Sequence, residues 1–299
     1  MTAHFIARRC SLAVSAVAAA VAVAPQSATA GPEAHADYVV IGKSINHRQT
    51  GATDLGLLNT VLFAEVFETE AGGVSNAVLR GPGEAADGLP FSGDGIHFLA
   101  GKRQQTIEEL TRSFPDTTYF FDFDTPAGQV RELPATFRRD AGETRNPGPI
   151  LVSLSQANRP AAPERIDPDL DLVVSWSPFV KGSADPDSII DDMIYVIVGN
   201  CLGEEVDHSG HAISNPDALT YRASEYVIDA AILKPGKTYQ LEVEHSNMDT
   251  GLEQDIEVIV TYAATTFLDV QTTGKTTDDA TCPSPPHAMD GGQTDRPRG

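Results

Sequence analysis

Basic residues, cysteine and tryptophan are scarce in this chain. It has 21 Lys and Arg against 42 Asp and Glu among 299 residues, with three cysteines and one tryptophan. The formal net charge of −21 makes nucleic acid and anionic lipid poor partners, because both repel an acidic protein surface. Cations and basic surfaces are compatible with this charge, and acidity also serves solubility alone.

Long apolar runs are also rare, and the longest lies near the N-terminus. Arg8 and Arg9 precede an alanine-rich apolar stretch, and Ala28-Thr29-Ala30 has the small residues of a signal-peptide cleavage site. Residues 1–30 are therefore predicted to be a signal peptide, with an uncleaved N-terminal anchor as the alternative. The run is too short to be interpreted as a membrane span. We expect a soluble protein without membrane insertion, either secreted or periplasmic.

Two cysteines, Cys201 and Cys282, follow the predicted signal peptide. In an oxidising compartment they are a candidate disulfide, which would tie the C-terminal tail to the preceding domain. An intermolecular bridge and two free thiols are the alternatives. Two cysteines cannot supply a structural zinc site by themselves.

Signatures of nucleophilic catalysis are missing from the sequence. There is no Gly-x-Ser-x-Gly motif, and Asp207, His208 and Ser209 are consecutive, so they cannot form the relay of a catalytic triad. A phosphate-binding loop, an Arg-Gly-Asp motif and an N-glycosylation acceptor are also missing. We therefore expect a non-enzymatic protein without a cofactor, although two carboxylates distant in sequence would still suit a glycoside hydrolase.

Clustered aspartates make calcium the candidate metal. Asp167 and Asp169 alternate along one segment, and Asp185 and Asp187 lie in a loop further along. Calcium takes six to eight oxygen ligands, so carboxylates gathered at loops suit it. The pattern is not that of a calcium-binding Asp-x-Asp-x-Asp-Gly loop, because Leu172 stands where glycine is needed. Solvated acidic loops are the alternative.

Two histidines offer a weaker candidate for zinc. His208 and His211 are three residues apart, and Gly210 would allow the segment to turn so that both rings converge. A third ligand, Glu204 or Glu205, would be needed. The alternative is a polar loop between strands.

Alternating apolar residues and frequent turn residues predict strands along most of the chain. The absence of a long helical period predicts an all-β fold of antiparallel sandwiches. Residues 81–95 are predicted to be a long loop, and residues 106–112 fit either a short helix or a strand. The predicted strands cover residues 38–42, 60–67, 75–79, 96–99, 119–123, 130–137, 150–155, 172–179, 193–198, 226–232, 240–244, 256–262 and 265–270.

A turn followed by a strand occurs twice, about 120 residues apart, as Pro115-Asp116-Thr117-Thr118-Tyr119 and Pro235-Gly236-Lys237-Thr238-Tyr239. In each copy the tyrosine and the alternate apolar residues after it share one face of the strand. The repetition predicts two tandem antiparallel β-sandwich domains, at residues 37–157 and 160–271. A proline-rich linker, Asn158-Arg159-Pro160-Ala161-Ala162-Pro163, would join them, and residues 272–299 are predicted to be a disordered tail.

The second of these segments resembles a fibronectin type III domain over about residues 160–270. The resemblance rests on Trp176 in the run V-V-S-W-S-P, on the strand I-Y-V-I-V, and on the corner ending in Tyr239, which here reads Pro-Gly-x-Thr-Tyr. Independently of the family, we expect Trp176, Tyr119 and Tyr239 to be structural, with the tyrosine hydroxyls bonded to the corner backbone. Gly236 would allow a positive φ.

The resemblance implies a non-enzymatic binding or spacer role, with an extracellular protein or a glycan as the partner. Loops such as 81–95 and 181–192, or an exposed strand edge, would make the contact. One alternative is a calcium-dependent adhesive or matrix module, which would bring the four aspartates together. The other is a secreted hydrolase acting on polysaccharide or peptide, which would need a deep pocket with two close carboxylates. The sequence does not determine the oligomeric state.

Overall fold

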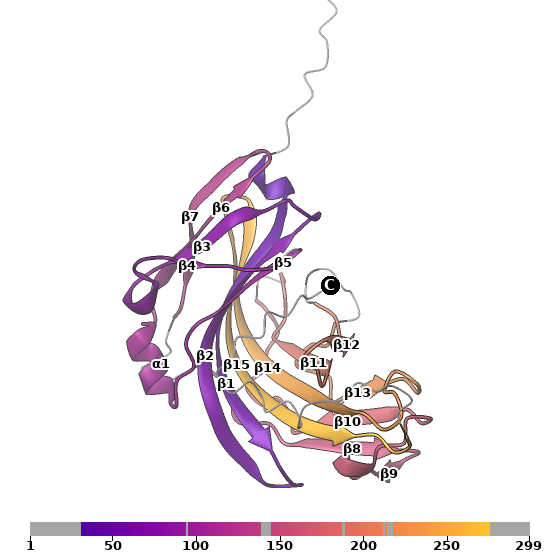
Figure 1. The fold of residues 1–299 in the computed structure, drawn as a ribbon. Helices are drawn as coiled ribbons and strands as arrows, with labels where there is room; N and C mark the ends of the chain where they lie inside the picture. The colour runs from indigo at the N-terminus through magenta and orange to yellow at the C-terminus, as the bar shows by residue number, and fades with distance from the viewer. Residues whose placement is uncertain are drawn as a thin grey trace, which may run out of the picture.

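The computed structural model describes residues 31–93, 95–138, 145–186, 189–211, 213 and 218–275. Over these residues the chain is mostly β, with three sheets and one short α-helix (Figure 1). The prediction of a chain built mainly from β-strands is thereby confirmed. The predicted signal peptide, at residues 1–30, and residues 276–299 of the predicted tail lie outside the described residues.

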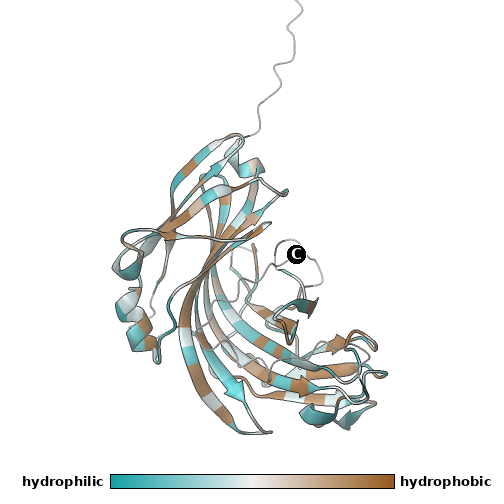
Figure 2. Ribbon diagram, in the orientation of Figure 1, coloured by the Kyte–Doolittle hydropathy of each residue, from teal (hydrophilic) through white to brown (hydrophobic). Residues whose placement is uncertain are grey.

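A seven-stranded sheet forms the centre of the fold, in the order β12-β11-β14-β15-β1-β2-β5. Two long antiparallel hairpins supply four of its strands, namely β1 (Ala36–Gln49) with β2 (Leu55–Glu68) and β14 (Thr238–Glu253) with β15 (Ile256–Gln271). The others are β5 (Ile96–Ala100), β11 (Met193–Asn200) and β12 (Glu205–His208). Figure 2 shows apolar residues alternating with polar ones along the long strands, as two-sided strands require.

The two hairpins meet through β1 and β15, which run parallel to each other. The prediction of purely antiparallel sheets is wrong for this pair. No short turn joins the two strands, because almost the whole chain lies between them, so nothing local imposes an antiparallel arrangement.

Two four-stranded sheets pack against one face of the central sheet, on its convex side (Figure 1). The first contains β4 (Leu89–Pro90), β3 (Ser75–Arg80), β6 (Thr118–Thr125) and β7 (Gly128–Thr136). The second contains β13 (Glu225–Ile228), β10 (Leu172–Trp176), β8 (Val152–Gln156) and β9 (Arg159–Pro160). Each encloses its own hydrophobic core with the central sheet, and short 3-10 turns lie at Pro32–Ala34, Gly83–Ala85 and Pro163–Arg165.

The central strand β15 contributes to both cores from the same face. Tyr262 belongs to the first core, whereas Ala264 and Leu268 belong to the second. The residues that alternate with them, including Thr261 and Thr265, face the opposite, concave side. A smaller hydrophobic cluster, which includes Tyr38, Phe67 and Ile259, covers part of that side, and a cavity lies beside it.

In each tyrosine corner the hydroxyl group bonds to the backbone of the corner, as a donor in the first and as an acceptor in the second. The Tyr119 hydroxyl donates to the Pro115 carbonyl at 3.0 Å, and the Tyr239 hydroxyl accepts from the Lys234 N–H at 2.7 Å. Gly236 has a φ of +67°, in the left-handed region. Trp176 is buried in the second core, and its indole N–H donates to the Ala223 carbonyl at 3.1 Å.

The short helix α1 (Ile107–Ser113) precedes the first corner. Thr106 caps its N-terminus, with the hydroxyl accepting from the Glu109 N–H at 3.2 Å, and the Glu109 carboxylate accepts in turn from the Gln105 N–H at 3.0 Å. This capping arrangement fixes a helix at the segment for which the sequence left helix and strand open.

Strands from both predicted segments join in one sheet. β8 belongs to the predicted segment 37–157 but pairs with β10 of the segment 160–271. Arg159 and Pro160, predicted to lie in the linker, form the edge strand β9 beside β8. An edge strand tolerates proline because the missing N–H need not pair. The division of the chain into two domains therefore stays a prediction, and unfolding experiments can test it.

Candidate functional site

A cavity of about 760 Å³ lies on the concave side of the central sheet. Its floor consists of the residues of β2, β1, β15 and β14 that face away from the two cores. Side chains from β11, from residues 90–92, from residues 98–103 around the end of β5, and from His208 and His211 complete its walls. Cavities of this size, roughly 300–1,000 Å³, are typical of small-molecule sites.

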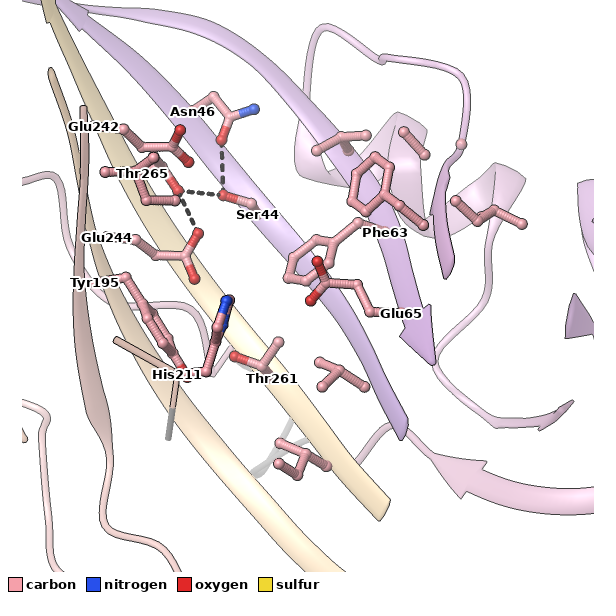
Figure 3. A pocket seen from close by; sticks show the side chains of 18 of the residues that line it. Ser44, Asn46, Phe63, Glu65, Tyr195, His211, Glu242, Glu244, Thr261 and Thr265 are labelled. Carbon is pink, nitrogen blue, oxygen red and sulfur yellow. Dashed lines mark hydrogen bonds between the residues drawn. The ribbon is translucent and has the colours of Figure 1, made fainter. Parts of the chain in front are cut away.

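Gly42 on β1 makes room for an aromatic side chain on the cavity floor. A Cβ atom at this position would collide with the Phe63 ring and the Thr261 methyl group, which approach from the neighbouring strands. The absence of a side chain therefore lets the Phe63 ring lie across β1. Phe63 lines the cavity as a result (Figure 3).

A row of polar side chains crosses the floor from strand to strand. The register places Glu244 opposite Thr265, Thr265 opposite Asn46, and Asn46 opposite Asn59. Hydrogen bonds join the row through Ser44, whose hydroxyl lies 2.8 Å from the Thr265 hydroxyl and donates to Asn46 Oδ1 at 2.7 Å (Figure 3). The Asn46 amide then donates to Asn59 Oδ1 at 2.9 Å.

Glu244 lies at one end of the row, and two hydroxyl groups donate to its carboxylate. The Thr265 hydroxyl donates to Glu244 Oε2 at 2.9 Å, and the Ser246 hydroxyl donates to Glu244 Oε1 at 2.6 Å. Ser44, whose hydroxyl contacts Thr265 and donates to Asn46, connects Glu244 to the rest of the row.

Burial and neighbouring charges favour the protonated state of Glu244. Burial beneath the cavity raises the pKa of Glu244 to about 7, against opposing hydrogen bonds from Ser246 and Thr265. The negative charges of Glu242 and Glu65 raise this pKa further. Glu244 therefore carries a proton in about half of the molecules near neutral pH.

Rings surround the end of the cavity where Glu65 lies. Tyr38 stacks on Phe67 with a centroid separation of 4.1 Å, and Phe67 meets His211 edge to face at 5.2 Å. His211 lies 4.5 Å from His208, which faces Tyr195 at 6.3 Å. Burial raises the pKa of Tyr195 well above its ordinary value, and the charge of Glu244 adds to the rise. The Tyr195 phenol is therefore neutral.

Thr261 contributes a buried hydroxyl group to the lining of the cavity. Its side chain is 2% exposed and lines the cavity beside His211 (Figure 3). Within the part of the chain that the structure describes, its hydroxyl has no hydrogen-bond partner. A buried hydroxyl without a partner is costly, so this atom indicates a place where a polar group of a ligand or a water molecule would bind.

The three predicted calcium ligands that the structure describes, Asp167, Asp169 and Asp185, lie in two hydrogen-bonded loops. Asp167 accepts from the Asp169 N–H at 3.1 Å. The Asp185 carboxylate accepts from Ile190 N–H and the Thr250 hydroxyl, each at 3.0 Å. Asp187 lies outside the described residues. Among the residues that are described, no group of three His, Cys, Asp or Glu side chains is arranged to hold a metal ion. A calcium site stays a prediction.

The segment predicted as the zinc candidate contributes to the cavity instead. The Nδ1 atom of His208 accepts from the Gly210 N–H at 2.7 Å, and the rings of His208 and His211 line the cavity wall. Cys201 is disulfide-bonded. Its predicted partner, Cys282, lies outside the described residues, so the pairing itself stays a prediction.

The central residues of the cavity were not identified from the sequence. Glu65 and Glu244 occur within strongly apolar strands, at positions that alternate with core residues. Such positions on a strand ordinarily face solvent, which is why the pattern alone gives no reason to single them out. A glutamate within a long apolar strand is the sequence feature that could have pointed to the cavity. The strands that carry these glutamates are far apart in the sequence, so the sequence alone does not show that they belong to one sheet.

Comparisons with known proteins give only distant matches. No family model and no curated protein matches this chain. It is similar to a solved structure described as a biofilm associated protein, BSP domain, with 13% identity and a TM-score of 0.19 over 78% of this chain. The match spans 29% of that longer chain. A second similarity, to the FN1–FN3 domains of chicken CNTN1, has 11% identity and a TM-score of 0.22, covering 80% of this chain and 68% of that one.

In the part of the chain that the structure describes, no helix is long and apolar enough to cross a membrane.

Proposed function

We propose that this protein is a secreted, non-enzymatic binding protein that takes a small extracellular molecule into the concave cavity. The observation that carries the proposal is the cavity itself, whose lining combines aromatic rings and carboxylates with the Thr261 hydroxyl, which has no hydrogen-bond partner among the described residues. Apolar walls with a few fixed polar groups are the usual composition of small-molecule sites.

The cavity is formed by rigid elements, which favours binding over a passive structural role. Its floor residues are held by the pairing of four long strands, and the polar row fixes their rotamers. A site formed in this way needs little reorganisation when a ligand enters, and that lowers the entropic cost of binding.

Secretion and a fibronectin type III-like second half are parts of the same proposal. The basic and apolar residues before Gly31 support export, and the shared core of Trp176 and Tyr239 supports the sandwich description of residues 160–271. An extracellular protein or glycan remains the predicted source of the ligand, with the bound portion limited to what the cavity accommodates.

A thermal-shift screen tests the proposal. The mature protein is melted with sugars, amines, organic acids and aromatic compounds, and a ligand at one hundred times its dissociation constant should add about 2.7 kcal/mol of stability. Ala100 is exposed and lines the cavity, so Ala100→Trp should narrow it and reduce the shift. Leu252→Trp, at the exposed end of β14, is the matched control and should retain the shift. Shifts that are equally large in both variants would place binding elsewhere.

A polysaccharide hydrolase is a second candidate function, favoured by one specific observation. Glu244, whose pKa is raised to about 7, shares the cavity with Glu65 and Glu242, and glycoside hydrolysis uses an acid of raised pKa together with a second carboxyl group. Release of reducing ends from a polysaccharide panel, lost in Glu244→Gln, would establish it. Equal release by both proteins would exclude Glu244 as the acid.

A further inference from the structure

The lining of the cavity changes from apolar to polar along the strands of its floor. At one end, apolar side chains of β1, β2, β5 and β15 line it, and most of them belong to one buried cluster, namely Tyr38, Val40, Phe67, Phe98 and Ile259. At the other end lies the hydrogen-bonded row of Ser44, Asn46, Thr265 and Glu244. A ligand that matches both ends has an apolar part and a polar part.

The apolar end has the length of an acyl chain. Tyr38 and Gly42 are four residues apart on β1, which at about 3.3 Å per residue corresponds to roughly 13 Å. One leaflet of the hydrocarbon core of a bilayer is about 15 Å thick, so an acyl chain slightly shorter than that of a membrane lipid would span this end.

Thr261 lies at the boundary between the two ends. It stands opposite Gly42 in the strand register, two residues beyond Ile259 and four residues before Thr265. Its side chain is 2% exposed, and its hydroxyl has no hydrogen-bond partner among the described residues. A carbonyl group of a ligand at this level would accept a hydrogen bond from the hydroxyl and so remove the cost of leaving it unpaired.

The polar row ends in a group of opposite charge on each side. Glu244 ends it on β14, and Arg103 donates to Asn59 Oδ1 on β2 at 3.2 Å. This arrangement favours neither an anionic nor a cationic head group, whereas hydroxyl groups can both donate and accept along the row. Glu65 lines the apolar end and is already engaged with other groups of the protein, so its carboxylate needs no partner from a ligand.

We propose that the ligand of this cavity is a single-chain acyl ester with an uncharged, hydroxylated head group. The chain lies between Tyr38 and Gly42, the ester carbonyl accepts from Thr261, and the head group bonds to the polar row. The proposal rests on the function proposed above and names the class of ligand. An acylated sugar has this chemistry, which agrees with a glycan as the source of the ligand.

Calorimetric titration with a matched pair of glycerol lipids tests the contact with Thr261. Monododecanoylglycerol contains the ester carbonyl, whereas dodecylglycerol is the ether that lacks it, and both are used below their critical micelle concentrations. We expect the ester to bind about tenfold more tightly, because only the ester can accept from the buried hydroxyl. Thr261→Val keeps the shape of the side chain and should bind the two lipids equally. Thr136→Val, at an exposed threonine of β7, is the control and should retain the preference.

Two further comparisons test the chain and the head group. From octanoyl to decanoyl to dodecanoyl glycerol, the affinity should rise about fourfold for each added methylene group, because each one buries apolar surface in the cavity. Methyl dodecanoate keeps the chain and the ester but lacks the hydroxyl groups, and it should bind about tenfold more weakly than monododecanoylglycerol.

The outcomes separate this inference from the proposed function. Equal affinity for ester and ether in the wild-type protein, an undiminished preference in Thr261→Val, an affinity independent of chain length, or equal binding of methyl dodecanoate would each overturn the inference. The binding function would still stand if a compound of the thermal screen binds in the cavity. The comparisons on the wild-type protein remain decisive even if Thr261→Val fails to fold. If neither the glycerol lipids nor any compound of the screen binds, the proposed function and the inference fail together.

Discussion

Glu244 and His245 are neighbours in β14 with opposite surroundings. Glu244 faces the cavity, and burial raises its pKa to about 7. His245 is 2% exposed on the other face, stacked on Phe179 at 4.5 Å, and burial lowers its pKa to about 4. Within the described residues its Nε2 atom has no hydrogen-bond partner, so nothing compensates a charge on this ring. Both side chains are therefore mainly neutral near pH 6.

Their effects on stability have opposite signs. The folded state holds the Glu244 proton between its unfolded pKa, about 4.5, and its folded pKa, about 7, so Glu244 lowers stability as the pH rises through this window. His245 takes up its proton on unfolding between about pH 4 and about pH 6.5, so it raises stability as the pH rises there. The two contributions largely cancel in the wild-type protein.

Removing Glu244 should reveal the pH dependence that His245 gives to the stability. Relative to wild type, Glu244→Gln should gain roughly 2–3 kcal/mol of unfolding free energy as the pH rises from about 4.5 to about 7. Urea denaturation at a series of pH values measures this difference, and Glu253→Gln serves as the control because its carboxylate is exposed. A difference that stays constant with pH would show that the Glu244 pKa is the same in the folded and unfolded states.

At the scale of elements, the sequence predicts the two corners better than it predicts the long strands. The proline and tyrosine of each corner, and the Thr106 cap with Glu109, act within a few residues, so the sequence indicates them directly. The sequence also indicated two strands at 256–262 and 265–270, whereas β15 runs through without a break. Ala263 and Ala264 weaken the alternation there, and only pairing with β1 and β14 shows that the strand continues.

The packing of β1, β2 and β15 around Gly42 gives a prediction at this scale. Gly42→Val should lose about 1–3 kcal/mol of unfolding free energy, because the new side chain displaces the Phe63 ring and the Thr261 methyl group. Gly251→Ala on β14, where an added Cβ has no atom within 4 Å, should be nearly neutral. Urea denaturation of both variants makes the comparison. Equal stability of the two variants would mean that Phe63 does not depend on the missing side chain.

At the scale of the whole molecule, the order of the strands is the feature that the sequence did not reveal. β1 and β15 lie side by side, although they come from opposite ends of the described chain. Pairing across such a distance leaves no local pattern, whereas the fold class follows from alternation alone. The cavity depends on this pairing, because its two main carboxylates come from β2 and β14. The site could therefore not be predicted from the sequence, for the same reason that the strand order could not.

The shared central sheet predicts that the chain unfolds as one unit. Leu133 and Val174 are fully buried, the first in one core and the second in the other. Leu133→Ala and Val174→Ala should each lower the midpoint of a single calorimetric transition, since β15 contributes to both cores. Two transitions, each shifted by only one of the variants, would instead support independent domains at residues 37–157 and 160–271.

The central claim, that the concave cavity binds a ligand, is tested most directly by methyl NMR during titration with a compound that stabilises the protein in the thermal screen. Thr265 faces the cavity, whereas its neighbour Thr266 is buried on the opposite face and donates to the Ile150 carbonyl at 2.8 Å. We expect the methyl signals of Thr261 and Thr265 to shift with saturation while that of Thr266 stays in place. Saturable shifts confined to methyl groups outside the cavity, or none with any compound of the screen, would contradict the claim.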